Sequence, residues 1–354
     1  MGAEKPKMLE VAQESHRLIR AIRTSASRLF SGREGHEPRQ RGIRIGLVNN
    51  MPDAALEDTE LQFRDLLEAA RGEQVVKMSL FSLPEVSRDA RGKQRVAEFY
   101  SGIEELWSSK LDALIVTGTE PRRSNMKEEP YWQALTRILD WAEVNTVSTV
   151  LSCLAAHASV LYSDGIPRHR LADKQFGVFE YRTVKHYLTN DTPSKIRIPH
   201  SRWNEVKEDA LVAHGYKVLT SSADAGADLF VKRRGKCLFV HFQGHPEYGA
   251  GTLLKEYRRD IKRYIRGERE IYPTMPKGYF DSDAARMLAS FEERVLADRH
   301  EMLIREFPES AVAASLEHSW RTSAVCLYRN WLQYIAARKV NATECSPVVR
   351  VDHA

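Results

Sequence analysis

The sequence predicts an α/β protein in which helices flank a mostly parallel sheet. Over the first half of the chain, short runs of β-branched and apolar residues alternate with stretches of helical periodicity. Strands that alternate with helices pair in parallel, with right-handed crossovers between them. In the second half, strand-like runs are joined by turns, which predicts an extra antiparallel section beside the parallel sheet.

In the first half, the opening strand covers residues 43–50 and ends at the turn Asn50–Met51–Pro52. Leucine and phenylalanine then recur at helical spacing, which predicts a helix over the residues that follow. We expect these elements in order: helix 55–70, strands near 75–80 and 111–118, helix 131–142, strand 146–151 and a helix after Cys153.

In the second half, three runs rich in aromatic and β-branched residues are typical of strands, and charged stretches with an apolar face are typical of helices. The expected strands are 176–181, 228–232 and 237–242, and the expected helices are 252–266, 281–305 and 320–337. The chain shows neither internal repeats nor a long linker. We therefore expect one catalytic domain over residues 41–340, with a helical or flexible N-terminal extension at 1–40 and a tail at 341–354.

Composition excludes several classes of function. The 354 residues carry 53 Lys and Arg against 48 Asp and Glu, and the resulting net charge of +5 is spread along the chain, so we expect no nucleic-acid partner. We find neither a signal peptide nor an apolar run of membrane-spanning length, which predicts a cytoplasmic protein without membrane contact. The four cysteines lie far apart without a C-x-x-C pair, so we expect no metal site.

Three polar turns follow predicted strands: Thr117–Gly118–Thr119, Ser152–Cys153 and Gly244–His245–Pro246–Glu247. They should meet, because the active crevice of an open parallel sheet lies beyond the carboxyl ends of its strands. At such a turn the thiol of Cys153 would be exposed, and the start of the next helix would lower its pKa. His245 with Glu247 resembles a general base and the carboxylate that orients it.

Each of these residues also has a structural interpretation. Cys153 alone could be a buried cysteine that packs as a small hydrophobe, and His245–Pro246–Glu247 alone could be a surface turn. His241 and His157 are rival bases. However, His241 falls inside a strand, and His157 lies one helical turn beyond Cys153.

Taken together, several short blocks resemble the homoserine O-succinyltransferase family, transacylases of methionine biosynthesis. The resemblance covers residues 45–336, and it rests on the shared order and spacing of the blocks, because each block alone is weak. Three blocks lie in the first half: Asn50–Met51–Pro52 with 58–63; 115–118 with Tyr131–Trp132; and Cys153 with 165–167 and Lys174. Four blocks follow: 177–179; 199–202; 244–248 with 252–253, Glu256 and Arg259–Asp260; and 330–332.

The resemblance implies a flavodoxin-like fold of the class I glutamine amidotransferase type, and a ping-pong acyl transfer. Cys153 would take the acyl group from acyl-CoA as a thioester, and His245, oriented by Glu247, would activate the hydroxyl of the acceptor homoserine. Lys174, Ser201 and Arg259 would hold that acceptor. Acyl-CoA would be a co-substrate with no cofactor besides, the partners would be small molecules, and the chain would form a homodimer.

The sequence departs from the family at two substrate loops. Family members carry a pair of lysines after Asn50–Met51–Pro52, whereas this chain reads Asp53–Ala54–Ala55–Leu56–Glu57. At the position associated with the choice of succinyl or acetyl group this chain has Arg122. Its guanidinium could pair with the free carboxylate of a succinyl group, or it could point to solvent.

Other functions stay open at this point. A different family reaction would use acetyl-CoA, or serine as acceptor. An amidotransferase-like hydrolase would act on glutamine, but the glycine-flanked Gly-x-Cys-x-Gly turn is missing, since this chain reads Leu151–Ser152–Cys153–Leu154–Ala155. A non-catalytic binding protein is the third class, and the retention of all three residues of the triad argues against it.

Overall fold

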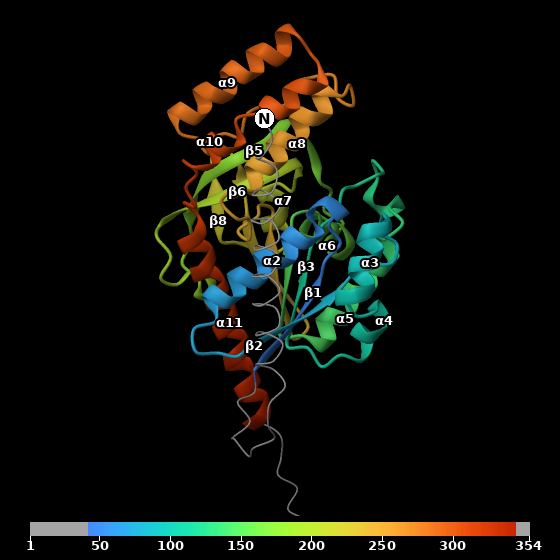
Figure 1. The fold of residues 1–354 in the computed structure, drawn as a ribbon. Coiled ribbons are helices and arrows are strands. Elements are labelled where there is room, and N and C mark those ends of the chain that lie inside the picture. The colour runs from blue at the N-terminus through green and yellow to red at the C-terminus, as the bar shows by residue number, and fades with distance from the viewer. Residues whose placement is uncertain (1–41, 345–354) are drawn as a thin grey trace, which may run out of the picture. The chain divides into compact units, whose positions relative to one another are not determined.

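The computed structural model describes residues 42–344, so the predicted N-terminal extension and residues 345–354 lie outside the described residues. Within that range the α/β class is confirmed by a seven-stranded sheet in the order β2-β1-β3-β4-β11-β10-β7 (Figure 1). The neighbours β2, β1, β3, β4 and β11 all pair in parallel. The strands are β1 (Ile43–Val48), β2 (Val76–Phe81), β3 (Ala113–Val116), β4 (Ser148–Ser152), β7 (Lys217–Val218), β10 (Leu229–Arg234) and β11 (Cys237–Phe242).

The strand β11 differs from the expectation that it would join the antiparallel section. It pairs in parallel with β4, with Leu238 opposite Ser148 and Phe242 opposite Ser152. All six residues of β11 are buried, as expected for a strand covered by helices on both faces. Only β10, which pairs antiparallel with β11, and the short β7 give this sheet an antiparallel edge.

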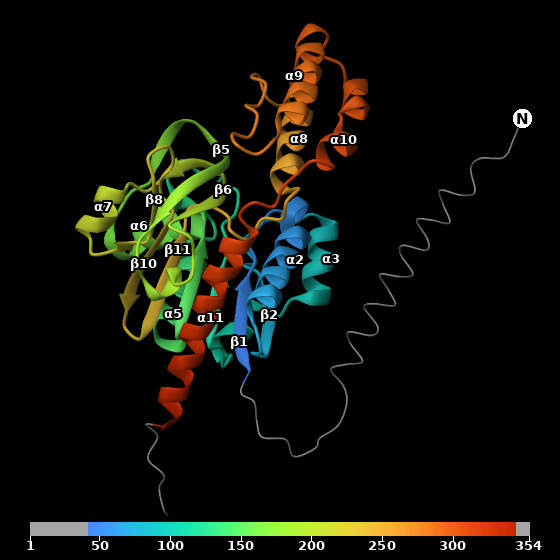
Figure 2. The same cartoon turned by 90° about the vertical axis from the view of Figure 1, so that its left-hand side faces the viewer.

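Helices cover both faces of the seven-stranded sheet (Figure 2). On one face α2 (Asp53–Ala70) and α11 (Arg321–Glu344) lie side by side and bury Phe63 and Trp331 against the strands. On the other face α4 (Ile103–Ser108), α5 (Trp132–Asn145) and α6 (Leu154–Asp164) bury Leu106, Ile138 and Ala155. A further helix, α3 (Ala90–Phe99), packs against α2.

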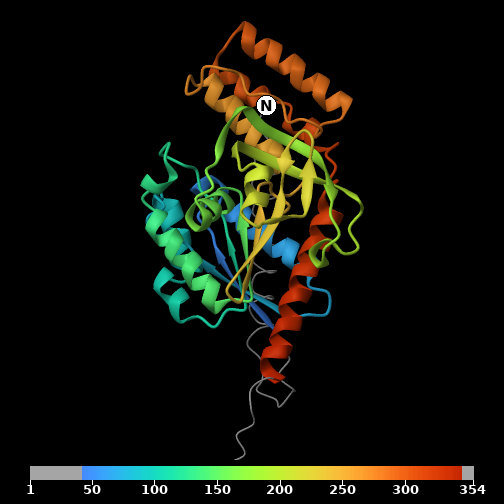
Figure 3. The same ribbon diagram turned by 180° about the vertical axis from the view of Figure 1, so that it is seen from behind.

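The expected antiparallel section is a separate four-stranded sheet in the order β6-β5-β8-β9 (Figure 3). Its main pair, β5 (His169–Thr183) and β6 (Lys195–Glu205), is antiparallel, with Gly177 opposite His200. The two remaining strands are short, β8 (Thr220–Ser222) and β9 (Gly226–Ala227), and α7 (Glu208–Ala213) connects β6 to β7. β6 was not predicted as a strand.

A helical layer with its own apolar cluster packs on β5. It consists of α8 (Thr252–Ile265), α9 (Ser282–Ala297) and α10 (Glu309–Ala313) (Figure 1). Apolar residues of these helices form one cluster with Phe176 and Val178 of β5. The helix predicted over 281–305 ends early because the backbone leaves helical geometry at Asp298 and resumes as a 3₁₀ turn over Glu301–Glu306. Conversely, α11 extends beyond the predicted residue 337 to Glu344.

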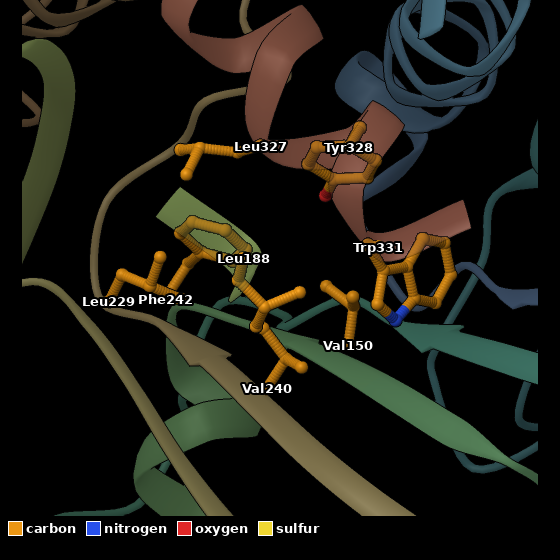
Figure 4. A pocket seen from close by; sticks show the side chains of 8 residues that line it. All are labelled: Val150, Leu188, Leu229, Val240, Phe242, Leu327, Tyr328 and Trp331. Atoms are coloured by element: carbon orange, nitrogen blue, oxygen red, sulfur yellow. The ribbon is translucent and has the colours of Figure 1, made fainter. Parts of the chain in front are cut away.

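A cavity of about 10 Å³ lies between α11 and the sheet, and Figure 4 shows its lining side chains. The lining is formed by Val150, Leu188, Leu229, Val240, Phe242, Leu327, Tyr328 and Trp331. Such a volume is about the room one water needs, far below that of a substrate pocket. Over residues 42–344, the helices are all too short or too polar to cross a membrane.

Candidate active site

The three polar turns predicted to converge follow β3, β4 and β11, which are adjacent and parallel in the sheet. Their carboxyl ends therefore lie at one edge. Gly118, after β3, packs so closely on the helix after β4 that a Cβ there would lie 2.8 Å from Cβ of Leu154. At the other turn, the hydroxyl of Ser152 donates a hydrogen bond to Oε1 of Glu247 at 3.2 Å.

Cys153 occupies a strained turn between β4 and α6. Its backbone angles are φ 52° and ψ −109°, and a positive φ is uncommon for a residue with a side chain. The backbone N–H of Cys153 donates to the carbonyl of Phe242 at 2.7 Å, which fixes the turn to the end of β11. Such strain persists only when the surroundings enforce it. Here it leaves the half-buried thiol in front of the first turn of α6.

His245 lies between the sulfur and a carboxylate. Its Nδ1 is 2.8 Å from Oε1 of Glu247, and its side chain is also hydrogen bonded to Cys153. The backbone N–H of His245 donates to the carbonyl of Pro199 on β6 at 2.9 Å. Burial opposes protonation of the imidazole, but the negative charges of Glu247 and Cys153 outweigh burial and hold the pKa of His245 well above its ordinary value. This arrangement favours an imidazolium beside the sulfur.

The two rival histidines make other contacts. The Nε2 of His157 lies 2.9 Å from Oε1 of Gln243, and the ring of His241 stacks on Phe230 with 4.7 Å between centroids. Both imidazoles are fully buried, and burial lowers the pKa of each to about 3. They are therefore held neutral within the fold.

Lys174, Ser201 and Arg259, the predicted acceptor-binding residues, do come together, around two carboxylates of α8. Lys174 Nζ lies 3.1 Å from Oδ2 of Asp260 and 3.8 Å from Oε2 of Glu256. The hydroxyl of Ser201 donates to Glu256, and Arg259 pairs with Asp260 at 3.1 Å. The cations of this acceptor cluster are thus already balanced by carboxylates in the same place.

Tyr248 connects the acceptor cluster to His245. Its ring stacks on the imidazole with 4.3 Å between centroids and 15° between planes. Its hydroxyl donates to Oε1 of Glu256 at 2.7 Å. The general-base candidate and the acceptor cluster therefore share one buried tyrosine.

Arg122 lies in the loop after β3 with its side chain exposed. The backbone N–H groups of Arg122 and Arg123 both donate to Oε1 of the buried Glu129, at 2.6 and 2.7 Å, which shapes the loop. The other oxygen of Glu129 and the hydroxyl of Tyr131 are buried without a hydrogen-bond partner among the described residues. This loop therefore leaves unused polar atoms inside the protein.

The turn after β1, where the family resemblance implies a pair of lysines, is held by an arginine from elsewhere in the chain. Helix α2 begins at Asp53, whose carboxylate binds Arg88 at 2.9 Å, and Arg88 also donates to the carbonyls of Met51 and Asn49. That guanidinium is therefore fully used in holding the turn. A different cation, Arg168, lies close enough to Cys153 for their charges to interact.

Four residues at this site were not predicted from the sequence. Glu256 and Asp260 stood in a quoted block, and their spacing of four on a predicted helix could have placed them on one face. Arg168 follows Gly165–Ile166–Pro167 and lies directly before β5. Asp228, beside Gly244, was predicted only as the first residue of a strand, and no local signal distinguishes it.

Comparisons with known proteins agree with the predicted family. A family model of homoserine O-succinyltransferase matches residues 12–342. The chain is 47% identical over 298 residues to a homoserine O-succinyltransferase of Rhodopseudomonas palustris, which covers 84% of this chain and 89% of the relative. It is 43% identical over 303 residues to that of Methylorubrum extorquens, with 85% and 90% covered. Among solved structures it is similar to a glutamine amidotransferase from Thermotoga maritima, with a TM-score of 0.42, 14% identity, and 83% and 98% of the two chains covered. The chain belongs to the homoserine O-succinyltransferase family of acyltransferases.

Proposed function

We propose that the protein transfers a succinyl group from succinyl-CoA to the hydroxyl of L-homoserine, through a thioester on Cys153. The observation that carries this proposal is the chain of contacts from the sulfur to His245 and on to Glu247, at the start of α6. The reaction needs no cofactor beyond the acyl-CoA substrate. We also retain the predictions of a homodimer and of a cytoplasmic location, and light scattering of the purified protein tests the first.

In the first half-reaction, the thiolate of Cys153 attacks the thioester carbonyl of succinyl-CoA. Leu154, the residue directly after the nucleophile, is the first residue of α6, and Gly118 packs against it. The backbone N–H groups of Leu154 and Gly118 are therefore suited to face the oxyanion that forms. The carbon–sulfur bond to CoA then breaks, and the imidazolium of His245 gives its proton to the departing CoA thiolate. The products are free CoA and a succinyl thioester on Cys153.

In the second half-reaction, the now neutral His245 takes the proton from the homoserine hydroxyl as the oxygen attacks the thioester. The carbon–sulfur bond to Cys153 breaks, which releases O-succinyl-L-homoserine and restores the thiolate and the imidazolium. We assign the amino-acid end of homoserine to the acceptor cluster. Its carboxylate would meet Arg259 and Lys174, and its ammonium group would meet Glu256.

The choice of acyl group depends on a cation for the free carboxylate of succinate. Arg122 is the candidate from sequence, and Arg168 is a second one, because its charge reaches Cys153 and Tyr131. Alanine variants at each position separate the two. The variant at the correct position should lose its preference for succinyl-CoA over acetyl-CoA by roughly tenfold or more, as expected for one charge-assisted pair.

Intact mass spectrometry tests the proposal. The protein is incubated separately with succinyl-CoA, acetyl-CoA and glutamine, and then each sample receives homoserine or serine. We expect one succinyl adduct at Cys153 that homoserine removes. An acetyl adduct would change the donor, removal by serine would change the acceptor, and glutaminase activity would favour the hydrolase. The absence of any adduct or product would contradict all three reactions.

A further inference from the structure

A buried carboxylate lies behind the turn that carries His245. Asp228 immediately precedes β10, and because β10 runs antiparallel to β11, its start lies beside the carboxyl end of β11. Its side chain is completely buried, and Oδ1 accepts a hydrogen bond of 2.6 Å from the backbone N–H of Gly244. The carbonyl of Asp228 also accepts from the N–H of Gln243 at 3.2 Å. Asp228 thus holds two consecutive residues before His245.

The other oxygen of this carboxylate, Oδ2, has no hydrogen-bond partner among the described residues. The nearest ionisable nitrogen is Nε2 of His200, 3.6 Å from Oδ1. Arg202 donates from Nε to Nδ1 of His200 at 3.2 Å, so Nδ1 carries a lone pair and the proton of this imidazole is on Nε2. Burial lowers the pKa of His200 well below its ordinary value, which agrees with a neutral ring. That Nε2 lies 2.8 Å from the hydroxyl oxygen of Tyr181, so its proton is used there, and His200 gives Asp228 neither a positive charge nor a hydrogen bond.

A buried carboxylate without a contacting cation is costly, and an uncharged residue would satisfy Gly244 equally well. The amide oxygen of an asparagine accepts the same backbone hydrogen bond. Arg202 attracts this charge without contacting it, because it donates its hydrogen bonds to His200 and to the carbonyls of Asn204 and Ala225. Within residues 42–344, the charge of Asp228 therefore makes no direct ion pair that the fold would need. The one group nearby that becomes positively charged during the proposed reaction is His245.

We propose that Asp228 is a positioning residue for the Cys153–His245 pair: it fixes the turn at Gly244, and its negative charge, together with that of Glu247, stabilises the imidazolium of His245. Asp228 does not touch substrate. It acts through His245, so the effect should appear in the reactivity of the sulfur even without any substrate present. Because this reactivity is measured without substrate, a negative result for Asp228 can be distinguished from a negative result for the proposed acyl transfer.

The electrostatics around Asp228 agree with that role. Burial raises the pKa of Asp228 to about 6, while the Gly244 hydrogen bond and the charges of Arg202 and His245 oppose the rise and Glu247 adds to it. Above that pH the carboxylate is charged. The attraction that lets the positive charge of His245 favour the ionised form of Asp228 also lets ionised Asp228 favour the protonated form of His245. The titratable and charged groups that face it from the packed elements are His200 and Arg202 of β6, Tyr181 of β5, His245 and Glu247 of the turn after β11, and Tyr328 of α11.

The first test is Asp228→Asn, followed by the rate at which iodoacetamide alkylates the Cys153 peptide across pH. We expect a rate about tenfold lower at pH 7.5 and a midpoint about one unit higher in pH, because the imidazolium loses one supporting charge. A profile that coincides with that of the native protein would overturn the proposal. In the native protein the alkylation rate should also fall as the pH is lowered through about 6, where Asp228 takes up a proton, and the asparagine variant should lack this fall. This difference is one of profile shape, so it does not require the two proteins to be equally folded.

The second test is stability, since it distinguishes positioning from a structural role. A carboxylate whose pKa is raised on folding weakens the fold when ionised, so Asp228→Asn should unfold at an equal or higher temperature than the native protein at pH 8. The control is Asp112→Asn, at another buried aspartate beside a strand of the same sheet. That variant should leave the alkylation profile unchanged. Loss of stability in Asp228→Asn in step with its loss of reactivity would instead mean that Asp228 is structural.

Discussion

Two buried aspartates lie at opposite ends of the seven-stranded sheet and differ in the hydrogen bonds and ion pairs that their carboxylates make. Asp112 precedes β3, and its Oδ2 accepts from the backbone N–H of Arg44 and from Lys339 Nζ, both at 2.7 Å. Asp228, at the carboxyl end of β11, has one oxygen bonded to Gly244, and the other has no hydrogen-bond partner within residues 42–344. The carboxylate of Asp112 is therefore paired directly with a cation, whereas that of Asp228 attracts Arg202 and His245 without a direct ion pair to either.

The same contrast extends to other groups near Cys153. Glu247 also has one buried oxygen that makes no hydrogen bond to the part of the chain that the structure describes, and the backbone of Cys153 itself has a positive φ. Groups that cost stability are expected where they serve chemistry and not where they only hold the fold. Substitutions at the carboxyl end should therefore reduce activity more than stability, and substitutions at the amino end should do the opposite.

The largest effect in this comparison should come from Glu247→Gln. The amide keeps the size of the side chain but loses the charge that stabilises the imidazolium of His245 and that orients its ring. We expect kcat for acyl transfer to fall about 10²- to 10³-fold with little change in the unfolding temperature. Steady-state kinetics and calorimetry on the same preparation check both halves, and a loss below threefold would contradict the role of this carboxylate.

A smaller loss should follow from Gly244→Ala. A Cβ at this position would lie 2.7 Å from the ring of His200 and 2.7 Å from Ile198, so the turn has to shift and carry His245 with it. We expect kcat to fall roughly tenfold. Gly251→Ala is the matched control, because no neighbouring atom of the described chain lies within 4 Å of its Cβ position. Equal activities of the two variants would mean that the position of the turn is not critical.

At the amino end, Asp112→Asn should change stability alone. It replaces the carboxylate that binds Lys339 and the backbone of Arg44. We expect the free energy of unfolding to fall by about 1 to 3 kcal/mol, as when a buried hydrogen bond to a charged group is lost. Chemical denaturation measures this value, and kcat should stay within a factor of two. A large loss of kcat would remove the distinction between the two ends.

The smallest expected effect concerns acid stability in the acceptor cluster. Burial would raise the pKa of Asp260, but Lys174 and Arg259 outweigh burial and lower it below 3.8. A lowered pKa contributes stability that is complete above the unfolded value and is lost as pH falls through the folded value. The native protein should therefore be more stable than Lys174→Met at pH 7, with a difference that shrinks below about pH 4. A difference independent of pH would contradict the ion pair.

Much of this architecture could be predicted from sequence, since β3 and β4 are buried throughout, β1 is buried except at Arg44, and the turns after them are polar. The same signals placed Cys153 and His245 at one edge of a sheet. Local patterns could not assign β11 to the parallel sheet, because the pairing partner of a buried strand depends on distant segments. They also could not find Asp228, because its role depends on β10 running antiparallel to β11 and on Gly244, 16 residues away.

The central claim is that Cys153 carries the acyl group between two substrates. The most direct measurement is the mass of the intact protein after brief exposure to succinyl-CoA without acceptor, beside that of Cys153→Ser treated in the same way. We expect the native protein to gain the mass of one succinyl group, mapped to the Cys153 peptide and discharged by homoserine, and the serine variant to gain none. An unmodified native protein that nevertheless forms O-succinyl-L-homoserine would contradict the claim, since the transfer would then be direct.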